Sequence, residues 1–161
     1  MLNVKIICIG KLKEKYLQMA QVEFEKRLNG YCKIEVIELN EVKCSENPSK
    51  KEIENVIEKE GLSILKKLNS NNPYVITLCI EGSIISSEIF AKELEKSHTI
   101  SGGTIYFIIG GSFGLCENVK KISSLKLSFS KMTFTHQMAR IILMEQIYRG
   151  FQINSNGKYH K

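Results

Sequence analysis

Three short runs that each follow a strand-like stretch are the segments of this chain best placed to do chemistry. They are residues 78–82, the glycine-rich run 109–115 and residues 129–134. Parallel strands end at one edge of an open sheet, and ligands bind outside that edge. The glycines allow positive φ angles and a close approach of backbone N–H groups to a ligand. Their spacing is not G-x-G-x-x-G, and a tight turn without any ligand explains them equally well.

Histidine and cysteine give little support for nucleophilic catalysis. His98, His136 and His160 stand outside any G-x-S-x-G or cysteine-protease context. His98 follows a lysine-rich helix end, where a cation suits the helix dipole, so its role is predicted to be structural. The last five residues, 157–161, carry two lysines, Tyr159 and His160, which can stack on a base and contact phosphate. A disordered end is the alternative.

The positive charge of the chain is concentrated at its C-terminal end. Residues 119–161 hold eight lysines and arginines against one glutamate, a balance of +7, whereas the other 118 residues hold 15 basic and 16 acidic side chains. A basic region of this kind favours a polyanionic partner, because each neutralised phosphate releases condensed counterions. A solvated lysine-rich face is the plainer explanation.

The composition excludes several classes of function. The 161 residues are 43% hydrophobic and 25% charged, which is typical of one globular domain. Without any aspartate, the chain lacks the residues of aspartic dyads and of aspartate-rich magnesium sites. The five cysteines form no C-x-x-C pair, so no zinc or other metal site is predicted, and Cys8 and Cys79 are expected to be packed in the core.

Location follows from the same features. The apolar runs are far shorter than the ~20 residues that cross a membrane. The N-terminus begins with a strand-like run and lacks a signal-peptide pattern. We therefore expect a cytoplasmic protein that does not interact with membranes.

Strand-like and helix-like segments alternate along the chain. The strand-like runs cover residues 4–9, 34–39, 74–80, 104–109 and 126–129, and the helix-like segments cover 14–28, 49–68, 86–97, 117–123 and 136–152. Ser49 and Glu52 have the spacing of a capping box at one helix start. The alternation predicts an α/β fold, a single domain with a mostly parallel sheet and helices on both faces.

The last helix is unusually apolar. Hydrophobic side chains occupy most positions from 138 to 151 and cover more than one face. Either the helix is buried on two sides within the domain or one face meets another chain, and we favour a homodimer contact. His136 and Arg140 share one face, while Arg149 lies about half a turn round the helix.

The combination of four motifs resembles the RlmH family of SPOUT-class methyltransferases. These motifs are IGGSFGL at 109–115, LSFSKMTFTHQMAR at 127–140, EQIYR at 145–149 and YHK at 159–161. The resemblance covers residues 1–161 as a single SPOUT domain and implies a homodimer with a trefoil knot near the C-terminus. The implied activity is methyl transfer from S-adenosylmethionine to N3 of a pseudouridine in 23S rRNA on the assembled ribosome.

The resemblance also implies site residues. The cofactor would be held by Leu78, Gly110, Phe129, Ser130, Lys131, Met132, Thr133 and Phe134. Thr135 stands where relatives commonly have proline, although threonine can also cap a helix. No metal and no covalent intermediate are implied.

A cation or donor near the base carbonyls would stabilise the anion that forms when N3 loses its proton. We assign this role to Arg140 and His160, the positioning of the base to Tyr159, and phosphate contacts to Arg149 and Lys161. Two other functions are open on the residues alone: a non-catalytic RNA-binding module, and a nucleotide-dependent enzyme with a small-molecule substrate.

Overall fold

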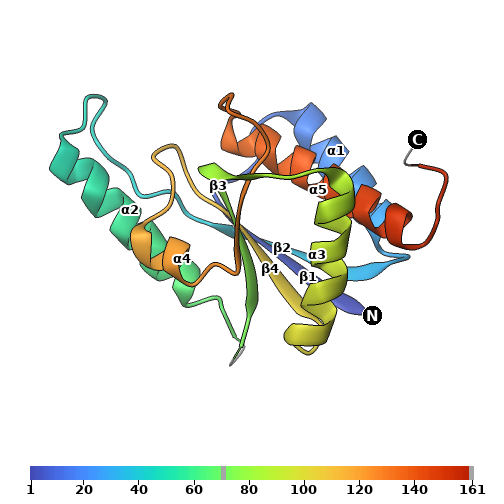
Figure 1. The fold of residues 1–161 in the computed structure, drawn as a ribbon. Helices are drawn as coiled ribbons and strands as arrows, with labels where there is room; N and C mark the ends of the chain where they lie inside the picture. Colours follow the sequence, from blue (N-terminus) through green and yellow to red (C-terminus); the bar gives the residue numbers. More distant parts are fainter. Residues whose placement is uncertain (70–71, 160–161) are drawn as a thin grey trace.

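A computed structural model describes residues 1–69 and 72–159 of the chain. The strands are β1 (Leu2–Ile9), β2 (Cys32–Leu39), β3 (Tyr74–Ile84), β4 (Thr104–Ile109) and β5 (Leu125–Ser128). The helices are α1 (Lys15–Leu28), α2 (Lys50–Leu65), α3 (Ser87–Ile100), α4 (Glu117–Lys121) and α5 (His136–Asn154). Each predicted element is present, and helices follow strands throughout (Figure 1).

The strands form one sheet in the order β2-β1-β4-β3-β5, and every neighbouring pair is parallel. All carboxyl ends therefore lie at one edge. Helices α1, α3 and α5 cover one face of the sheet and α2 and α4 cover the other (Figure 1). The prediction of an α/β domain with helices on both faces is confirmed.

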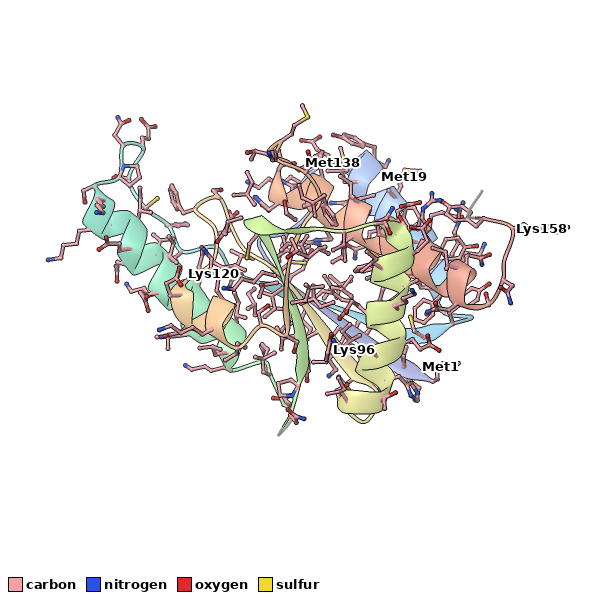
Figure 2. All side chains as sticks on the ribbon, viewed as in Figure 1. Met1, Met19, Lys96, Lys120, Met138 and Lys158 are labelled. Atoms are coloured by element: carbon pink, nitrogen blue, oxygen red, sulfur yellow. The ribbon has the colours of Figure 1, made fainter. Side chains whose placement is uncertain are left out.

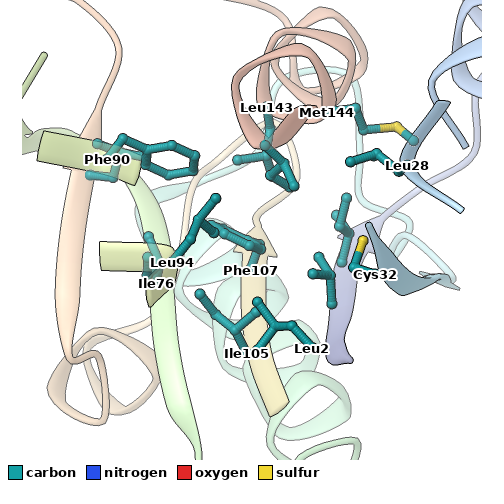
Figure 3. Packing of buried hydrophobic residues seen from close by; sticks show 14 of the residues in the cluster. Leu2, Leu28, Cys32, Ile76, Phe90, Leu94, Ile105, Phe107, Leu143 and Met144 are labelled. Atoms are coloured by element: carbon teal, nitrogen blue, oxygen red, sulfur yellow. The ribbon is translucent and has the colours of Figure 1, made fainter. Parts of the chain in front are cut away.

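The two faces of the sheet bury two separate hydrophobic clusters. In β1, Ile6 packs toward α1, α3 and α5, and its neighbour Ile7 packs toward α2 and α4. In β4, Phe107 and Ile108 divide between the faces in the same way. Figure 3 shows Phe107 beneath the side chains of α3 and α5. Full burial of each such side chain contributes about 1.5–3 kcal/mol, so both faces stabilise the sheet.

Helix α5 lies between α1 and α3, and this explains its apolar sequence. Leu143, Met144 and Ile147 are fully buried. They pack with Leu28 of α1 and Phe90 of α3 in the larger cluster (Figure 3). Of the two explanations offered by the sequence, burial on two sides is the one that the structure shows for these residues.

The caps match the sequence. The Ser49 hydroxyl accepts a hydrogen bond from the backbone N–H of Glu52, and the Glu52 carboxylate accepts one from the backbone N–H of Ser49, which completes the predicted capping box. At the start of α5, the Thr135 hydroxyl accepts from the Met138 N–H at 3.2 Å. Threonine in place of proline therefore leaves this helix with a capped start.

The bounds differ most at β3, which lies between β4 and the edge strand β5. β3 continues to Ile84, four residues beyond the predicted end, and β5 ends at Ser128. The register of β3 on β5 shifts between Leu78 and Ser83, so that both of these residues pair with Leu127. Such a bulge bends the strand and interrupts the apolar pattern from which strands are predicted. The extension therefore has no periodic signal in the sequence.

Candidate functional site

A groove of about 750 Å³ lies at the carboxyl ends of β4 and β5 and beside residues 78–81 of β3. The segment 128–137, which leads into α5, closes one side of it, and Lys120 of α4 lies on its rim. Most of its walls are apolar, formed by Leu78, Ile80, Ile109, Phe113, Leu115, Leu127, Phe129, Met132 and Phe134. The groove thus joins the three segments that the sequence identified separately.

The glycine-rich run forms a tight turn at the groove. The Gly114 N–H donates to the Gly111 carbonyl at 3.1 Å, and Gly114 has a φ of +87°. A Cβ on Gly110 would lie 2.9 Å from the Gly114 carbonyl, too close for any side chain. The main chain itself therefore lines this part of the groove, as expected of a turn that binds a ligand through backbone groups.

The segment after β5 is shaped by its own serines. The Ser128 hydroxyl donates to the Ser130 carbonyl at 2.9 Å, and the Ser130 hydroxyl accepts from the Met132 N–H at 3.1 Å. Met132 is 75% exposed and Phe134 is 41% exposed, although both line the groove. Exposed apolar side chains at a concave site are available to a ligand.

Of the predicted cofactor residues, seven line the groove: Leu78, Gly110, Phe129, Ser130, Met132, Thr133 and Phe134. Lys131 is exposed to solvent and does not line it. The structure thus brings together residues from three segments that are up to fifty-six positions apart in the chain.

One ion pair on the rim was not predicted. Lys120 Nζ lies 2.5 Å from Glu81 Oε1, and both residues line the groove. The hydrogen bond from Lys120 lowers the pKa of Glu81, and the bond to Glu81 raises the pKa of Lys120. No spacing signals a pair that joins α4 to the end of β3, so only the fold reveals it.

His136 was also missed as a groove residue. It is the first residue of α5 and lines the groove, and its Nε2 lies 3.5 Å from Glu41 Oε1. Burial lowers the pKa of His136, and the nearby positive charges of Arg140 and Lys13 lower it further, while Glu41 raises it. The sequence placed His136 on the face of Arg140 but gave it no role.

Arg140 lies behind the groove wall and is almost completely buried, at 1% exposure. Its guanidinium donates to Glu38 Oε1 at 2.6 Å, to the Gly10 carbonyl at 3.0 Å and to Gln21 Oε1 at 3.1 Å. These contacts tie α5 to β2, to the end of β1 and to α1. The structure therefore places this predicted catalytic residue inside the domain, one helical turn from His136.

Arg149 and Tyr159 lie together at the other end of α5. Arg149 pairs with Glu145 at 2.6 Å, and its guanidinium lies 4.8 Å from the centre of the Tyr159 ring. The Tyr159 hydroxyl donates to Glu145 Oε1 at 3.2 Å, and its ring meets that of Tyr148 edge-on. Burial and the Glu145 carboxylate raise the pKa of Tyr159.

This cluster is remote from the groove of the same chain. Thirteen residues separate His136 from Arg149 along α5, about 20 Å of helix. Figure 2 shows Lys158 at the opposite side of the molecule from Lys120 on the groove rim. The predicted His160 and Lys161 lie outside the described residues.

Cys8 and Cys79 are buried, as the packing role predicted for them requires, and Cys32 is buried as well. Burial raises the pKa of Cys8 and of Cys32 to about 12, and it also raises the pKa of Cys79. Cys79 is at the groove, but as a neutral thiol it is a poor nucleophile at neutral pH.

Within residues 1–69 and 72–159, no group of three or more His, Cys, Asp or Glu side chains is placed to bind a metal ion. No helix in this part of the chain has both the length and the apolar character needed to span a bilayer.

The fold and groove define an α/β protein with a ligand site built on backbone turns at the carboxyl edge of a parallel sheet. Residues 2–160 match the profile of a family described as "Predicted SPOUT methyltransferase". The chain belongs to this SPOUT methyltransferase family.

Relatives match over almost the whole chain. It is 49% identical to "Ribosomal RNA large subunit methyltransferase H" of Clostridioides difficile (strain 630), with 99% of this chain and 100% of the relative covered. It is 51% identical, with the same coverage, to the protein of that name from Bacillus cereus (strain B4264). "Ribosomal RNA large subunit methyltransferase H 1" of Clostridium perfringens (strain SM101 / Type A) is 48% identical, again over 99% of this chain and 100% of the relative. These matches confirm the family resemblance seen in the motifs.

Proposed function

We propose that the protein transfers a methyl group from S-adenosylmethionine to N3 of a pseudouridine in 23S rRNA on the assembled ribosome. The observation that carries this proposal is the convergence of seven predicted cofactor residues on one groove at the sheet edge. Relatives about 50% identical over the full chain are named for methylation of large-subunit ribosomal RNA. An enzyme with this substrate works in the cytoplasm.

The groove fits the cofactor in size and character. Its volume of about 750 Å³ lies within the roughly 300–1,000 Å³ typical of small-molecule sites. Apolar walls such as Leu78 and Phe129 suit the adenine ring, and the backbone of the turn at 110–114 offers polar groups to the rest of the molecule. When bound there, the cofactor supplies a methyl group on a sulfonium, so a metal or a covalent enzyme intermediate is not required.

The charged residues keep their predicted assignments in this proposal. Arg149 and Lys161 contact phosphate, and Tyr159 and His160 meet the target base. Arg140 has a different position from the others because it is buried. It acts on an anion that forms on the base from behind the groove wall, where its pair with Glu38 offsets much of its charge.

A homodimer is part of the proposal, because Tyr159 and the groove are far apart in a single chain. A second copy that presents its C-terminal residues to the groove would complete the site. Tyr16, Met19 and Val22 form an apolar stripe on α1, and each is more than 60% exposed. Met138 of α5 is also exposed, and it lies with Met19 along the same upper edge in Figure 2. We infer that this α1 stripe is the contact between copies.

The trefoil knot also belongs to the proposal. The three segments that would form it, residues 78–85, 109–116 and 128–135, all contribute to the groove. A knotted pocket of this kind binds the cofactor through its loops rather than through conspicuous charged side chains, as the composition of the groove walls indicates.

Methyl-labelled S-adenosylmethionine and ribosomes from cells that lack the enzyme provide the test. We expect label on one pseudouridine of the large-subunit RNA. If the protein binds the cofactor but leaves the ribosomes unlabelled, the proposed substrate is wrong. Ribosome binding without cofactor binding or transfer would favour the RNA-binding module instead. Sedimentation of the purified protein tests the dimer, and Met19→Glu should dissociate it.

A further inference from the structure

We propose that His136 is the group that takes the N3 proton from the base, and that Glu41 is its positioning residue. This inference rests on the proposed function, since N3 must lose a proton before it becomes a good nucleophile. Such a reaction requires a proton acceptor near the reacting nitrogen, and this acceptor must be unprotonated at working pH. His136 is the one histidine that lines the groove within the described residues.

The position of His136 is fixed from two sides. Thr135 caps the helix in front of it, and Gln137 beyond it accepts a hydrogen bond from the Lys13 N–H at 2.9 Å. The side chain is 19% exposed, so it reaches the groove but is held by its surroundings. A proton acceptor on the first turn of a well-packed helix has a defined position relative to the bound ligands.

Glu41 faces the imidazole from the loop after β2. Its carboxylate lies 3.5 Å from His136 Nε2, which leaves Nδ1 as the nitrogen not engaged by that carboxylate. A carboxylate in this position stabilises the imidazolium that forms when the ring accepts a proton and holds the ring in place. The positive groups that act on the ring are Arg140, on the same helix, and Lys13.

Gly10 makes room for this arrangement. It has a φ of +87°, and a Cβ there would lie 3.0 Å from Glu41 Oε1. The carboxylate therefore passes directly over the end of β1. The same Gly10 accepts a hydrogen bond from Arg140 through its carbonyl, so one turn holds both the positioning carboxylate and the buried cation.

Each bond that breaks is matched by a bond that forms. The N3–H bond of the pseudouridine breaks first and its proton goes to the His136 imidazole, and the nitrogen electron pair that remains then forms the new N–CH₃ bond. The methyl carbon leaves sulfur with the bonding pair remaining on sulfur, so the sulfonium becomes a neutral thioether. The imidazolium beside Glu41 then returns its proton to water.

The first test is the single-turnover rate of methyl transfer at saturating cofactor. His136→Gln should lower this rate about 100-fold or more, with the cofactor dissociation constant unchanged by calorimetry. His98→Gln is the matched control, because His98 is exposed on α3 away from the groove. A wild-type rate for His136→Gln, or a loss restored in full by more cofactor, would overturn the proposal.

The pH dependence gives a second test. In the wild type the rate should fall as the pH drops through the pKa of His136, because the protonated ring cannot accept a proton. His136→Gln should lose the inflection at this pKa and the plateau above it, so that its residual rate rises with hydroxide concentration over the whole range. Glu41→Gln should move the inflection to lower pH, since Glu41 raises the pKa of the ring.

An NMR titration of the protein without cofactor provides a readout apart from activity. His136 should titrate below the ordinary histidine value of about 6.5, and further below it in Glu41→Gln. If Glu41→Gln shifts the NMR titration and leaves the inflection of the rate in place, His136 is not the proton acceptor. If the wild type binds cofactor but methylates no ribosome, the proposed function fails rather than this inference.

Discussion

The two ends of α5 each hold an arginine paired with a glutamate, but the two pairs differ in burial. At the first end, Arg140 is 1% exposed and donates to Glu38, Gln21 and the Gly10 carbonyl. At the other end, the Arg149 side chain is 25% exposed, and its pair with Glu145 lies within one helix. The nearest atoms of each pair lie 2.6 Å apart, so distance does not distinguish them.

The difference shows that burial and connectivity decide what an ion pair does. Arg140 joins four elements, and removing it leaves polar groups inside the domain without partners. Arg149 joins one helix to the chain end, and water can replace its contacts. The first pair is therefore a structural link beside the groove, whereas the second lies partly exposed at the surface.

The largest expected effect is on folding stability at the buried end. Arg140→Met keeps the apolar stem but removes the donors to Glu38, Gln21 and Gly10. We expect the free energy of unfolding in urea to fall by about 2–4 kcal/mol. This loss is smaller than for a fully buried ion pair, because Glu38 is partly exposed. A loss below about 1 kcal/mol would contradict the link assigned to this residue.

At the exposed end, a change at Arg149 should affect ribosome binding more than folding stability. Arg149→Met should weaken binding about tenfold and lower the slope of log affinity against log salt by about 1. Binding at several salt concentrations gives both quantities. Lys96→Met is the control, because Lys96 lies on α3, away from Lys158 near the C-terminus in Figure 2. It makes the same change of charge and should leave the affinity nearly unchanged.

The groove end should also show a modest pH effect on stability. The pKa of His136 is lower in the folded protein than in the unfolded chain, so the unfolded state binds the proton more readily. This part of the stability is present above about pH 6.5 and is lost as the pH falls toward the folded-state pKa. Between pH 7 and 5, the free energy of unfolding measured in urea should fall less steeply for His136→Gln than for the wild type. Parallel curves would show that His136 is not shielded from protonation.

The smallest effect should be the stability change at the exposed end. Arg149→Met should lower the free energy of unfolding by at most about 1 kcal/mol, because the Glu145 pair is partly solvated. The same urea experiment as for Arg140→Met checks it. A loss as large as that of Arg140→Met would remove the contrast between the two ends.

Much of the fold could be predicted because it depends on local patterns. The alternation of strand and helix signals gave each element, and the Ser49 and Glu52 pair marked the start of α2 within one residue. The end of β3 was missed, since a bulge breaks the alternating pattern there. The apolar surface of α5 did not by itself tell burial between α1 and α3 from contact with another chain, because both place the same side chains out of water.

The site divides in the same way. The segments at 78, 110 and 129–134 were found because parallel strands place their carboxyl ends together, and the family motifs cover them. Lys120 and Glu81 were not paired, and His136 and Glu41 were not connected, because each pair joins segments more than thirty residues apart in the chain. Local spacing contains no information about such contacts.

The sequence by itself determined the α/β class, the groove-forming segments and the basic C-terminal end, since each depends on residues that are neighbours in the chain. Only the tertiary structure decided that Arg140 is buried, that His136 meets Glu41 at the groove and that Tyr159 lies far from the groove of its own chain. The physical reason is that burial and electrostatic environment depend on which elements pack together. The same arginine is a buried link at one end of α5 and a partly exposed charge at the other.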